Sequence, residues 1–320
     1  MVELALAAAA ERLLASQRPL LTVHVSPDGD AIGAMLGLYW LLVEQGCQPT
    51  MVVDDAVPAV FQNLLGAELI QPVTETNIDA DLLVVLDASD DGRIGRVRQL
   101  VTPGLPVLNI DHHISNTGFS EMRWLDVQAA ATAEMIAQLA EHWQYAYGRT
   151  GVAEALYTGI ATDCGFFRYA NTTPRTMRLA ARLLEMGVQP NEVSDRLETQ
   201  PLQMVSKLTD ILSGLEMHSD GRVALMSIPL EQYDPDADSD SFIRYPRYIA
   251  GVEVAVLLKS VAADVTRVSM RSKELDVSAV ALQFGGGGHK RAAGCTILRP
   301  LDEAKTVILQ ALAEAIDHGQ

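Results

Sequence analysis

Short apolar runs alternate with helical patterns along the first half of the chain. The runs at residues 19–25, 50–54, 81–87 and 105–111 have the length and composition of β-strands, and a helical pattern at 31–46 separates the first two. The run DLLVVLD at 81–87 is continuously apolar, which is typical of a strand covered on both faces. Strands that alternate with helices indicate a parallel sheet. We therefore predict an N-terminal α/β domain with a mainly parallel sheet flanked by helices.

The middle of the chain is predicted to be helical. Helical patterns cover residues 130–142, 152–161, 174–186 and 190–215. Gly187 and Pro190 interrupt this region, which favours a domain boundary close by. The predicted organisation is an N-terminal domain of residues 1–190, a helical linker of 191–215 and a C-terminal domain of 216–320.

The C-terminal third has a different pattern. Strands are predicted at 222–228, 252–260 and 265–272, and helices at 276–284 and 301–317. The polar segment 234–247 is predicted to be a surface loop, and GGGGHKRAAG at 285–294 a glycine loop. These elements predict a smaller α/β domain with a mixed sheet.

Composition narrows the class of ligand. The length of 320 residues and a hydrophobic content of 48% suit two packed domains. The 41 acidic and 24 basic residues give a net charge of −17, which argues against non-specific binding of long duplex DNA or other long nucleic acid, because that needs a broad basic surface. A short phosphorylated ligand is compatible with this charge, since metal ions and a few local cations can bind one or two phosphates.

The cysteine content and the N-terminal segment indicate the cellular compartment in which the protein is expected. Cys47, Cys164 and Cys295 are few, widely spaced and odd in number, so neither a disulfide framework nor a thiolate zinc site is expected, and a reducing cytoplasm is predicted. The N-terminal segment MVELALAAAAERLLASQ lacks a basic region and predicts an amphipathic helix rather than a signal peptide. No run of about 20 uncharged apolar residues occurs, so neither a transmembrane helix nor a membrane partner is expected.

Candidate chemistry begins in the segment HVSPDGDAIGA, directly after the first predicted strand. Asp28 and Asp30 are two residues apart, so an extended turn would point both side chains the same way. Together with His24 they form a hard oxygen and nitrogen ligand set that suits Mn²⁺ or Mg²⁺. Taken alone, the segment is equally compatible with an Asp-Gly turn that caps a helix.

Three further polar groups follow apolar elements. Asp87 ends the strand DLLVVLD, where an unpaired carboxylate would be costly to bury, so it either caps the next turn or ligates a cation. Asp111, His112 and His113 follow another apolar strand, and a polar loop with incidental histidines is the alternative. Asp163 follows an apolar helix and is by itself compatible with a structural role.

The four groups in combination predict a metal centre. Ligands of parallel α/β sheets bind at the carboxyl ends of the strands, where these side chains are expected to meet. Such a cluster can hold two divalent cations about 3.5–4 Å apart. Paired cations acidify water and neutralise charge on phosphate oxygens, so the predicted reaction class is phosphoester hydrolysis.

The segments HVSPDGDAIGA, VVLDASD, NIDHHISNTGF and YTGIATDCGFFRY resemble the four ordered motifs of the DHH phosphoesterase family. Residues 268–294, VSMRSKELDVSAVALQFGGGGHKRAAG, resemble that family's DHH-associated C-terminal domain. The matching order and spacing extend over nearly the whole chain. Within the family, the resemblance is strongest to the bacterial bifunctional oligoribonucleases (nanoRNases) that are also 3′-phosphoadenosine 5′-phosphate (pAp) phosphatases.

This resemblance implies an activity and a set of site residues. The implied enzyme uses two divalent metal ions to hydrolyse short oligoribonucleotides to 5′-mononucleotides, to remove the 3′-phosphate of pAp and give AMP, or both. Mn²⁺ is the expected metal, with Mg²⁺ or Co²⁺ as alternatives. The implied metal ligands are His24, Asp28, Asp30, Asp87, His112 and Asp163, with Asp87 bridging. His113 is expected to contact the scissile phosphate or the leaving group, and Asp111 to orient the histidines.

The glycine loop is expected to bind substrate. Consecutive glycines let a backbone approach a ligand closely and present N–H groups to phosphate, although a merely flexible loop is the alternative. In the related family this loop and an arginine bind the terminal phosphate or nucleotide. The resemblance therefore assigns substrate contacts to Gly287, Gly288, His289 and Arg271, and also to Arg247 at a family position near the cleft. A cleft between two domains would admit only short substrates.

The sequence is also compatible with three other functions. A phosphodiesterase of cyclic or linear dinucleotides cleaves the same type of bond. A family II inorganic pyrophosphatase shares the DHH metal site, but carries a Ser-Arg-Lys motif where this chain has Arg271-Ser272-Lys273. A non-catalytic nucleotide-binding regulator would not need a complete set of metal ligands. A homodimer is compatible with all of these functions.

Overall fold

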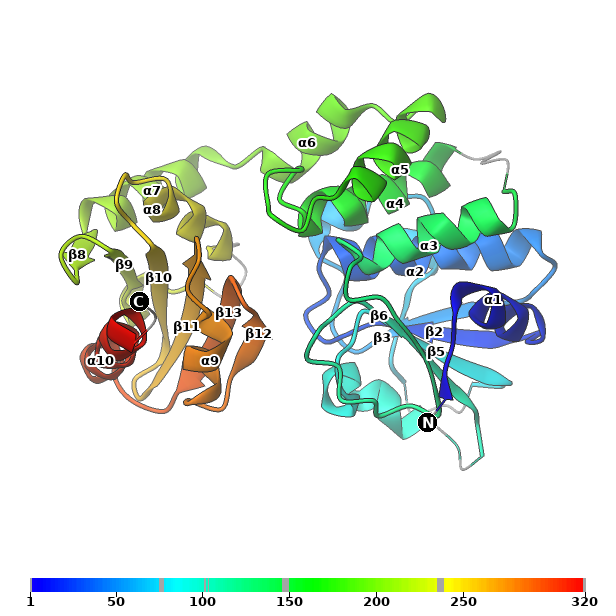
Figure 1. The fold of residues 1–320 in the computed structure, drawn as a ribbon, viewed down its shortest axis with the longest axis horizontal. Helices are drawn as coiled ribbons and strands as arrows, with labels where there is room; N and C mark the ends of the chain where they lie inside the picture. The colour runs from blue at the N-terminus through cyan, green and yellow to red at the C-terminus, as the bar shows by residue number, and fades with distance from the viewer. Residues whose placement is uncertain are drawn as a thin grey trace. The chain divides into compact units, whose positions relative to one another are not determined.

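The computed structural model describes residues 2–74, 78–100, 102, 104–145, 150–234 and 239–318, apart from the side chains of residues 150, 240, 289 and 318. The chain forms two compact units, Met1–Thr199 and Gln200–Gln320. The division between the units falls inside the segment 191–215, for which the sequence predicts a helical linker. Figure 1 shows the elements of each unit.

The first unit contains a seven-stranded sheet in the order β1-β7-β6-β5-β2-β3-β4. Every pair of neighbouring strands is parallel. The strands are β1 (Val2–Glu3), β2 (Pro19–Thr22), β3 (Thr50–Val53), β4 (Gln71–Pro72), β5 (Leu82–Leu86), β6 (Val107–Asp111) and β7 (Met122–Leu125). The sequence predicted the four central strands of this sheet and missed β1, β4 and β7, which are short and lie toward its edges.

Helices cover one face of this sheet and a 3-10 segment covers the other (Figure 1). The helices are α1 (Leu6–Leu14), α2 (Gly29–Glu44), α3 (Thr132–His142), α4 (Thr150–Asp163), α5 (Pro174–Glu185) and α6 (Pro190–Glu198). The 3-10 elements are η1 (Ala59–Phe61), η2 (Ala67–Leu69) and η3 (Asp91–Leu100). In β5, Val84 packs in the core with the helices, whereas Leu83 and Val85 pack against η3. Strand β5 is therefore covered on both faces, as its continuous apolar sequence predicted.

Helices α2 and α4 approach each other closely through glycines. A Cβ atom on Gly33 would lie 2.4 Å from the carbonyl oxygen of Ala155 and 2.9 Å from the backbone nitrogen of Gly159, distances that no real side chain tolerates. The helices run antiparallel here, since Gly29 at the start of α2 contacts Thr162 at the end of α4. This packing brings the first turn of α2 beside the last turn of α4.

The second unit contains a six-stranded sheet in the order β12-β13-β11-β10-β9-β8. Strands β9 and β10 are parallel and the other neighbours are antiparallel, so the sheet is mixed. The strands are β8 (Glu216–His218), β9 (Val223–Ile228), β10 (Val254–Ala262), β11 (Val265–Ser272), β12 (Gly287–His289) and β13 (Ala292–Ile297). One face packs on α9 (Val277–Leu282) and α10 (Leu301–His318), and the other on α7 (Leu202–Ser213) and η5 (Asp240–Ile243). The predicted fold class is confirmed for both units.

Two local predictions in the second unit are wrong. The segment 285–294 is mostly not a loop, because Gly287–His289 forms β12 and pairs antiparallel with β13. Within 234–247, residues 235–238 lie outside the described residues, but the rest is not simply a surface loop. It forms η5 and then α8 (Arg244–Arg247), with the side chains of Phe242 and Ile243 buried against the sheet. These two apolar residues anchor the segment.

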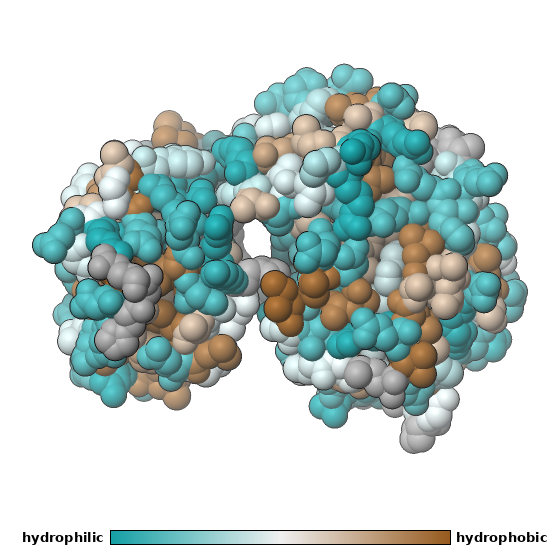
Figure 2. Space-filling view, viewed as in Figure 1, coloured by the Kyte–Doolittle hydropathy of each residue, from teal (hydrophilic) through white to brown (hydrophobic). Residues whose placement is uncertain are grey.

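On the face that Figure 2 shows, hydrophilic residues cover most of the surface of each unit. The hydrophobic patches on this face are separate from one another. Among the described helices, none is both long enough and apolar enough to cross a membrane.

Candidate metal centre

The turn after β2 places the first group of predicted ligands. Asp28 is the N-cap residue of α2, and its Oδ1 accepts hydrogen bonds from the backbone N–H groups of Asp30 and Ala31, at 3.0 and 3.1 Å. The Nε2 atom of His24 lies 3.8 Å from the same Oδ1 atom. The capping role and the ligand role, which the sequence presents as alternatives, are therefore geometrically compatible in Asp28.

Asp87 lies directly after β5 and is only 2% exposed. Its φ angle of 56° falls in the left-handed region, which aspartate tolerates better than most residues. Its Oδ2 lies 3.5 Å from Nε2 of His24, and its Oδ1 lies 3.5 Å from Nε2 of His112 and 3.6 Å from Nδ1 of His113. Asp87 is thus shared between imidazoles that come from two different strand ends.

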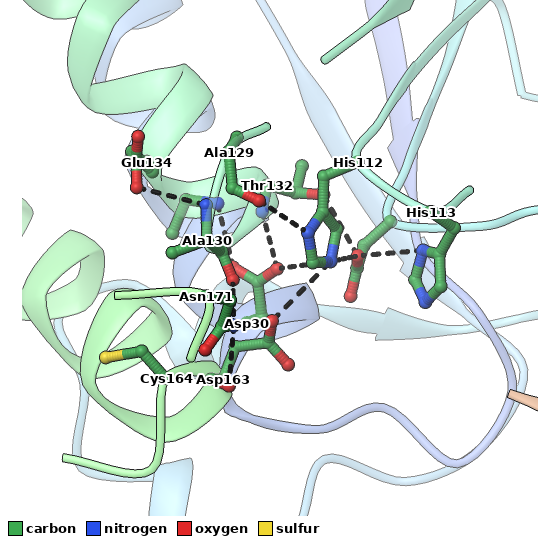
Figure 3. Close-up of polar contacts among 12 residues, drawn as sticks. Asp30, His112, His113, Ala129, Ala130, Thr132, Glu134, Asp163, Cys164 and Asn171 are labelled. Atoms are coloured by element: carbon green, nitrogen blue, oxygen red, sulfur yellow. Dashed lines mark hydrogen bonds and ion pairs between the residues drawn. The ribbon is translucent and has the colours of Figure 1, made fainter. Parts of the chain in front are cut away.

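The second group gathers around His112. Its Nε2 atom lies 3.8 Å from Oδ2 of Asp30 and 3.6 Å from Oδ2 of Asp163. Asp30 is in the first turn of α2 and Asp163 ends α4, so the close packing of these two helices brings the carboxylates together. Figure 3 shows both side chains directed toward His112.

Two imidazoles are oriented by backbone carbonyls. The Nδ1 atom of His24 lies 2.8 Å from the backbone carbonyl oxygen of the next residue, Val25. The Nδ1 atom of His112 lies 3.2 Å from the backbone carbonyl oxygen of Ala129. A carbonyl can only accept, so each Nδ1 is the donor in these contacts. Each Nε2 therefore faces the carboxylates, which is the orientation that a metal-binding histidine needs.

The buried carboxylates repel one another. Burial, with repulsion from Asp87, Asp163 and Asp28, raises the pKa of Asp30 well above its usual value. Burial also raises the pKa of Asp163 to about 7, against the opposing effect of His112. Among the described residues, no lysine or arginine forms an ion pair with any of these four carboxylates. Among the described residues, the cationic side chains paired with these carboxylates are therefore the histidines.

The neighbouring carboxylates raise the pKa of two histidines, His24 and His113. Burial would lower the pKa of His24, but interactions with Asp28 and Asp87 raise it to about 10. Burial would also lower the pKa of His113, but Asp111 and Asp87 raise it to about 9. Burial would raise the pKa of Asp87, but His24 and the other imidazoles hold it well below its usual range. The protonated imidazoles thus stabilise the negative charge of the carboxylates. A bound divalent cation would neutralise the same charge instead.

The donor set fits divalent cations. Three clusters have ligand atoms within 4.8 Å of one another: His24 with Asp28 and Asp87, Asp30 with His112 and Asp163, and Asp87 with His112 and His113. Ligand atoms about 2.1 Å from one ion lie roughly 3–4 Å from each other, and the distances from Nε2 of His24 and His112 to these carboxylate oxygens are 3.5–3.8 Å. Carboxylate oxygens and imidazole nitrogens without thiolates suit Mn²⁺ or Mg²⁺. Since Asp87 belongs to two clusters, the geometry can hold two adjacent ions.

His113 lies in a hydrogen-bonded chain beside these clusters. Its Nδ1 atom donates to Oδ1 of Asp111 at 2.7 Å, and the side-chain amide of Asn116 donates to Oδ2 of Asp111 at 2.6 Å. Arg123 in turn donates to the amide oxygen of Asn116 at 3.1 Å. Asp111 is fully buried, so its contacts hold the orientation of the His113 ring.

The predicted substrate residues all lie in the second unit. Arg271 on β11 and His289 on β12 both pair with Ala292 of β13, so these two positions share one cross-strand row. The side chain of His289 lies outside the described residues. Gly288 has a φ angle of 134°, and a Cβ atom there would lie 2.5 Å from the carbonyl oxygen of Ala292, so only glycine fits. Arg247 ends α8, which packs on β9, β10 and β11.

Three polar residues beside the metal centre were missed from the sequence. Thr132 donates to Asp87, and Asn171 donates to the backbone carbonyl of Asp163. Glu134, two residues after Thr132, is a fully buried carboxylate. Acidic residues are enriched in the first turn of a helix, and Glu134 has this position in α3, whose N-cap residue is Ala131. That preference agrees with the helix predicted over 130–142, but it does not predict the contacts with the cluster.

Comparisons with known proteins identify the family. Residues 20–160 match the DHH family N-terminal domain, and residues 224–317 match the DHHA1 domain. The chain is 36% identical over 318 residues to the Thermus thermophilus protein named bifunctional oligoribonuclease and PAP phosphatase NrnA, covering 96% of this chain and 93% of that one. It is 28% identical over 293 residues to the Bacillus subtilis protein of the same name, covering 89% and 90%.

The solved structure of an exopolyphosphatase-related protein from Bacteroides fragilis has the same fold, with a TM-score of 0.87 at 25% identity, and covers 97% of this chain and 95% of that chain. The full-length sequence similarity and the two domain matches agree. The chain belongs to the DHH phosphoesterase family, which confirms the resemblance seen in its motifs.

Proposed function

We propose that this chain is a two-metal phosphoesterase that hydrolyses short oligoribonucleotides to 5′-mononucleotides and removes the 3′-phosphate of pAp to give AMP. The observation that carries the proposal is the position of Asp87, whose two carboxylate oxygens face different histidines. The Thermus and Bacillus relatives align with this chain over most of its length and most of their own. Their names support the same substrates.

The proposed ligands divide into two sets that share Asp87. One ion would be held by His24, Asp28 and Asp87, whose ligand atoms form one cluster. The other would be held by Asp30, Asp87, His112 and Asp163. Mn²⁺ is the proposed metal, because carboxylate and imidazole donors in this mixture suit it, and Mg²⁺ or Co²⁺ would suit the same donors.

When bound, such cations would polarise a phosphate oxygen and lower the pKa of a water molecule. The chain's own residues supply orientation. Asp111 accepts from Nδ1 of His113, so the atom we propose for contact with the scissile phosphate or leaving group is Nε2. Asp111 does not face solvent, and its hydrogen bond from Asn116 keeps it from turning away. His113 is therefore held in one orientation before substrate arrives.

Substrate binding is proposed for the second unit. Arg271, Gly287, Gly288, His289 and Arg247 are the proposed contacts with a terminal phosphate or nucleotide. Arg271 and His289 share one row on β11 and β12, the strands that flank β13, which supports a common role. A net charge of −17 disfavours long polyanions, which supports short substrates over duplex DNA.

The compartment is proposed to be the reducing cytoplasm. The three cysteines are buried free thiols and form no disulfide. Enzymes that act on nucleotides and short RNA would meet their substrates there.

A substrate panel in the presence of Mn²⁺ tests the proposed function. The panel contains pAp, a diribonucleotide, a longer single strand, a cyclic dinucleotide and pyrophosphate. We expect turnover of pAp and the diribonucleotide, with weak or no turnover of the others. Preferred cleavage of the cyclic dinucleotide or of pyrophosphate would replace the proposed substrates, and no turnover of any phosphoester would favour a binding protein.

Replacing Arg271 with alanine is expected to weaken substrate binding. A hydrogen bond to a charged group contributes about 1.5–3 kcal/mol, so KM for pAp should rise roughly 10- to 100-fold with a much smaller change in kcat. Steady-state kinetics measure this, with Arg299→Ala as the control, since Arg299 is an exposed arginine elsewhere in the same unit. An unchanged KM for pAp would remove Arg271 from the substrate site.

A further inference from the structure

The segment 129–134, which leads into α3, contacts Asp30 and His112 of one proposed metal site (Figure 3) and Asp87, which the two sites share. It follows β7 and is almost entirely buried. None of its residues belongs to the proposed ligand set. Its apolar composition, Ala-Ala-Ala-Thr-Ala-Glu, makes the buried threonine and glutamate stand out.

Asp30 receives two hydrogen bonds from this segment. The backbone N–H of Thr132 donates to Oδ2 of Asp30 at 2.6 Å, and that of Ala133 donates to Oδ1 at 2.8 Å. These N–H groups belong to the first turn of α3 and have no partner within the helix. Both oxygens of Asp30 are thereby fixed in position, and the helix dipole favours their negative charge.

The same segment contacts two other proposed ligands and is linked to a third through Asn171. The hydroxyl of Thr132 donates to Oδ1 of Asp87 at 2.9 Å, and the carbonyl of Ala129 faces Nδ1 of His112 at 3.2 Å. The amide of Asn171 donates to the carbonyls of Ala130 and Asp163, at 3.0 and 3.2 Å, which ties the segment to the end of α4. A displacement of the segment would therefore move several ligands together.

Glu134 holds the segment from the side away from the cluster. Its Oε2 accepts from the backbone N–H of Ala130 at 3.1 Å and from the hydroxyl of Thr176 at 2.7 Å. Its Oε1 accepts from Nε of Arg175 at 2.5 Å. Glu134 is 0% exposed, so an isolated charge there would be costly, and these three donors satisfy it. Thr176 and Arg175 lie in α5, which anchors the segment to a packed helix.

We propose that Glu134 is a positioning residue for the metal centre, acting through the backbone of residues 129–133, with Asn171 as its partner on the other side. Glu134 fixes Ala130 to α5, and the segment then presents its donors to Asp30 and Asp87 and its carbonyl to His112. This inference rests on the proposed two-metal site, but it concerns how that site is held and not what it hydrolyses.

Mn²⁺ affinity measured by isothermal titration calorimetry tests this role. Glu134→Met keeps the length of the side chain and removes both acceptors, and we expect it to weaken Mn²⁺ binding about 10- to 100-fold. Glu134→Gln retains one acceptor for Ala130 and Thr176, while Arg175 keeps its ion pair with Asp126, so this variant should recover most of the affinity. Asn171→Ala should weaken binding about tenfold.

Glu141→Met is the matched control. Glu141 lies on the same helix and pairs with Arg182 near the surface at 2.8 Å, so the same substitution there should leave Mn²⁺ affinity unchanged. A purely structural role for Glu134 would lower the melting temperature of the metal-free protein without weakening Mn²⁺ binding by the folded protein. That result overturns the proposal, and if Glu134→Met does not fold, wild-type affinity in Asn171→Ala overturns it equally.

The two proposals fail in different ways. If the wild-type chain binds Mn²⁺ but cleaves neither pAp nor a diribonucleotide, the proposed substrates are wrong. The role of Glu134 is read from Mn²⁺ affinity alone and would still be decided by the variants.

Discussion

Asp87→Asn is expected to lower kcat by about 10³-fold or more on both pAp and a diribonucleotide, measured with saturating Mn²⁺. The substitution keeps the shape of the side chain and removes its charge. In the structure, the two oxygens of Asp87 face His24 on one side and His112 on the other. An amide offers only one acceptor, so it cannot serve both proposed ions, and the loss should exceed that from any ligand of a single ion.

Asp79→Asn is the control for this experiment. Asp79 is an exposed aspartate that pairs with Arg18 at 2.9 Å, away from the cluster, and its substitution should leave kcat unchanged. Circular dichroism must show that Asp87→Asn retains the native secondary structure. Full turnover by a folded Asp87→Asn variant would refute a mechanism that depends on a shared carboxylate.

His113→Ala is expected to lower kcat about 10²- to 10³-fold while the protein still binds two Mn²⁺ ions. The reason is that His113 is proposed to contact substrate, with Nδ1 engaged by Asp111. The measurement combines steady-state kinetics with a metal count. Loss of one ion in this variant would instead make His113 a metal ligand, a role that its position beside Asp87 and His112 also allows.

His142→Ala serves as the control for His113→Ala. His142 ends α3 and is exposed, and the same substitution there should change neither kcat nor the metal count. Reduced turnover in both variants would point to a general effect of removing a histidine.

The metal centre could be located from the sequence because it follows the strands. The apolar runs that became β2, β5 and β6 were visible, and His24, Asp87 and His112 come at or just after their carboxyl ends. In a parallel sheet those ends share one edge, so their proximity follows from the fold class. Asp163 was a weaker candidate, because its place depends on how closely α4 packs on α2. That packing is set by Gly33 and Gly159, which no periodic pattern marks.

Other features depended on contacts distant in sequence. Strand β12 was missed because a run of glycines indicates a turn, whereas here Gly287 and Gly288 pair with β13. Glu134 was missed because a glutamate in the first turn of a helix usually faces solvent. It is buried here because Thr176 and Arg175, about 40 residues further on, supply its donors. Such pairing across the chain becomes visible only in three dimensions.

The number of Mn²⁺ ions bound per chain tests the central claim most directly. The wild-type protein is stripped of metal, titrated with Mn²⁺ and counted by calorimetry, with electron paramagnetic resonance to detect magnetic coupling between neighbouring ions. Two ions per chain with a coupled signal are predicted, because Asp87 faces His24 of one proposed ligand set and His112 of the other. A single ion per chain, or two ions without coupling, would contradict a bridged two-metal centre.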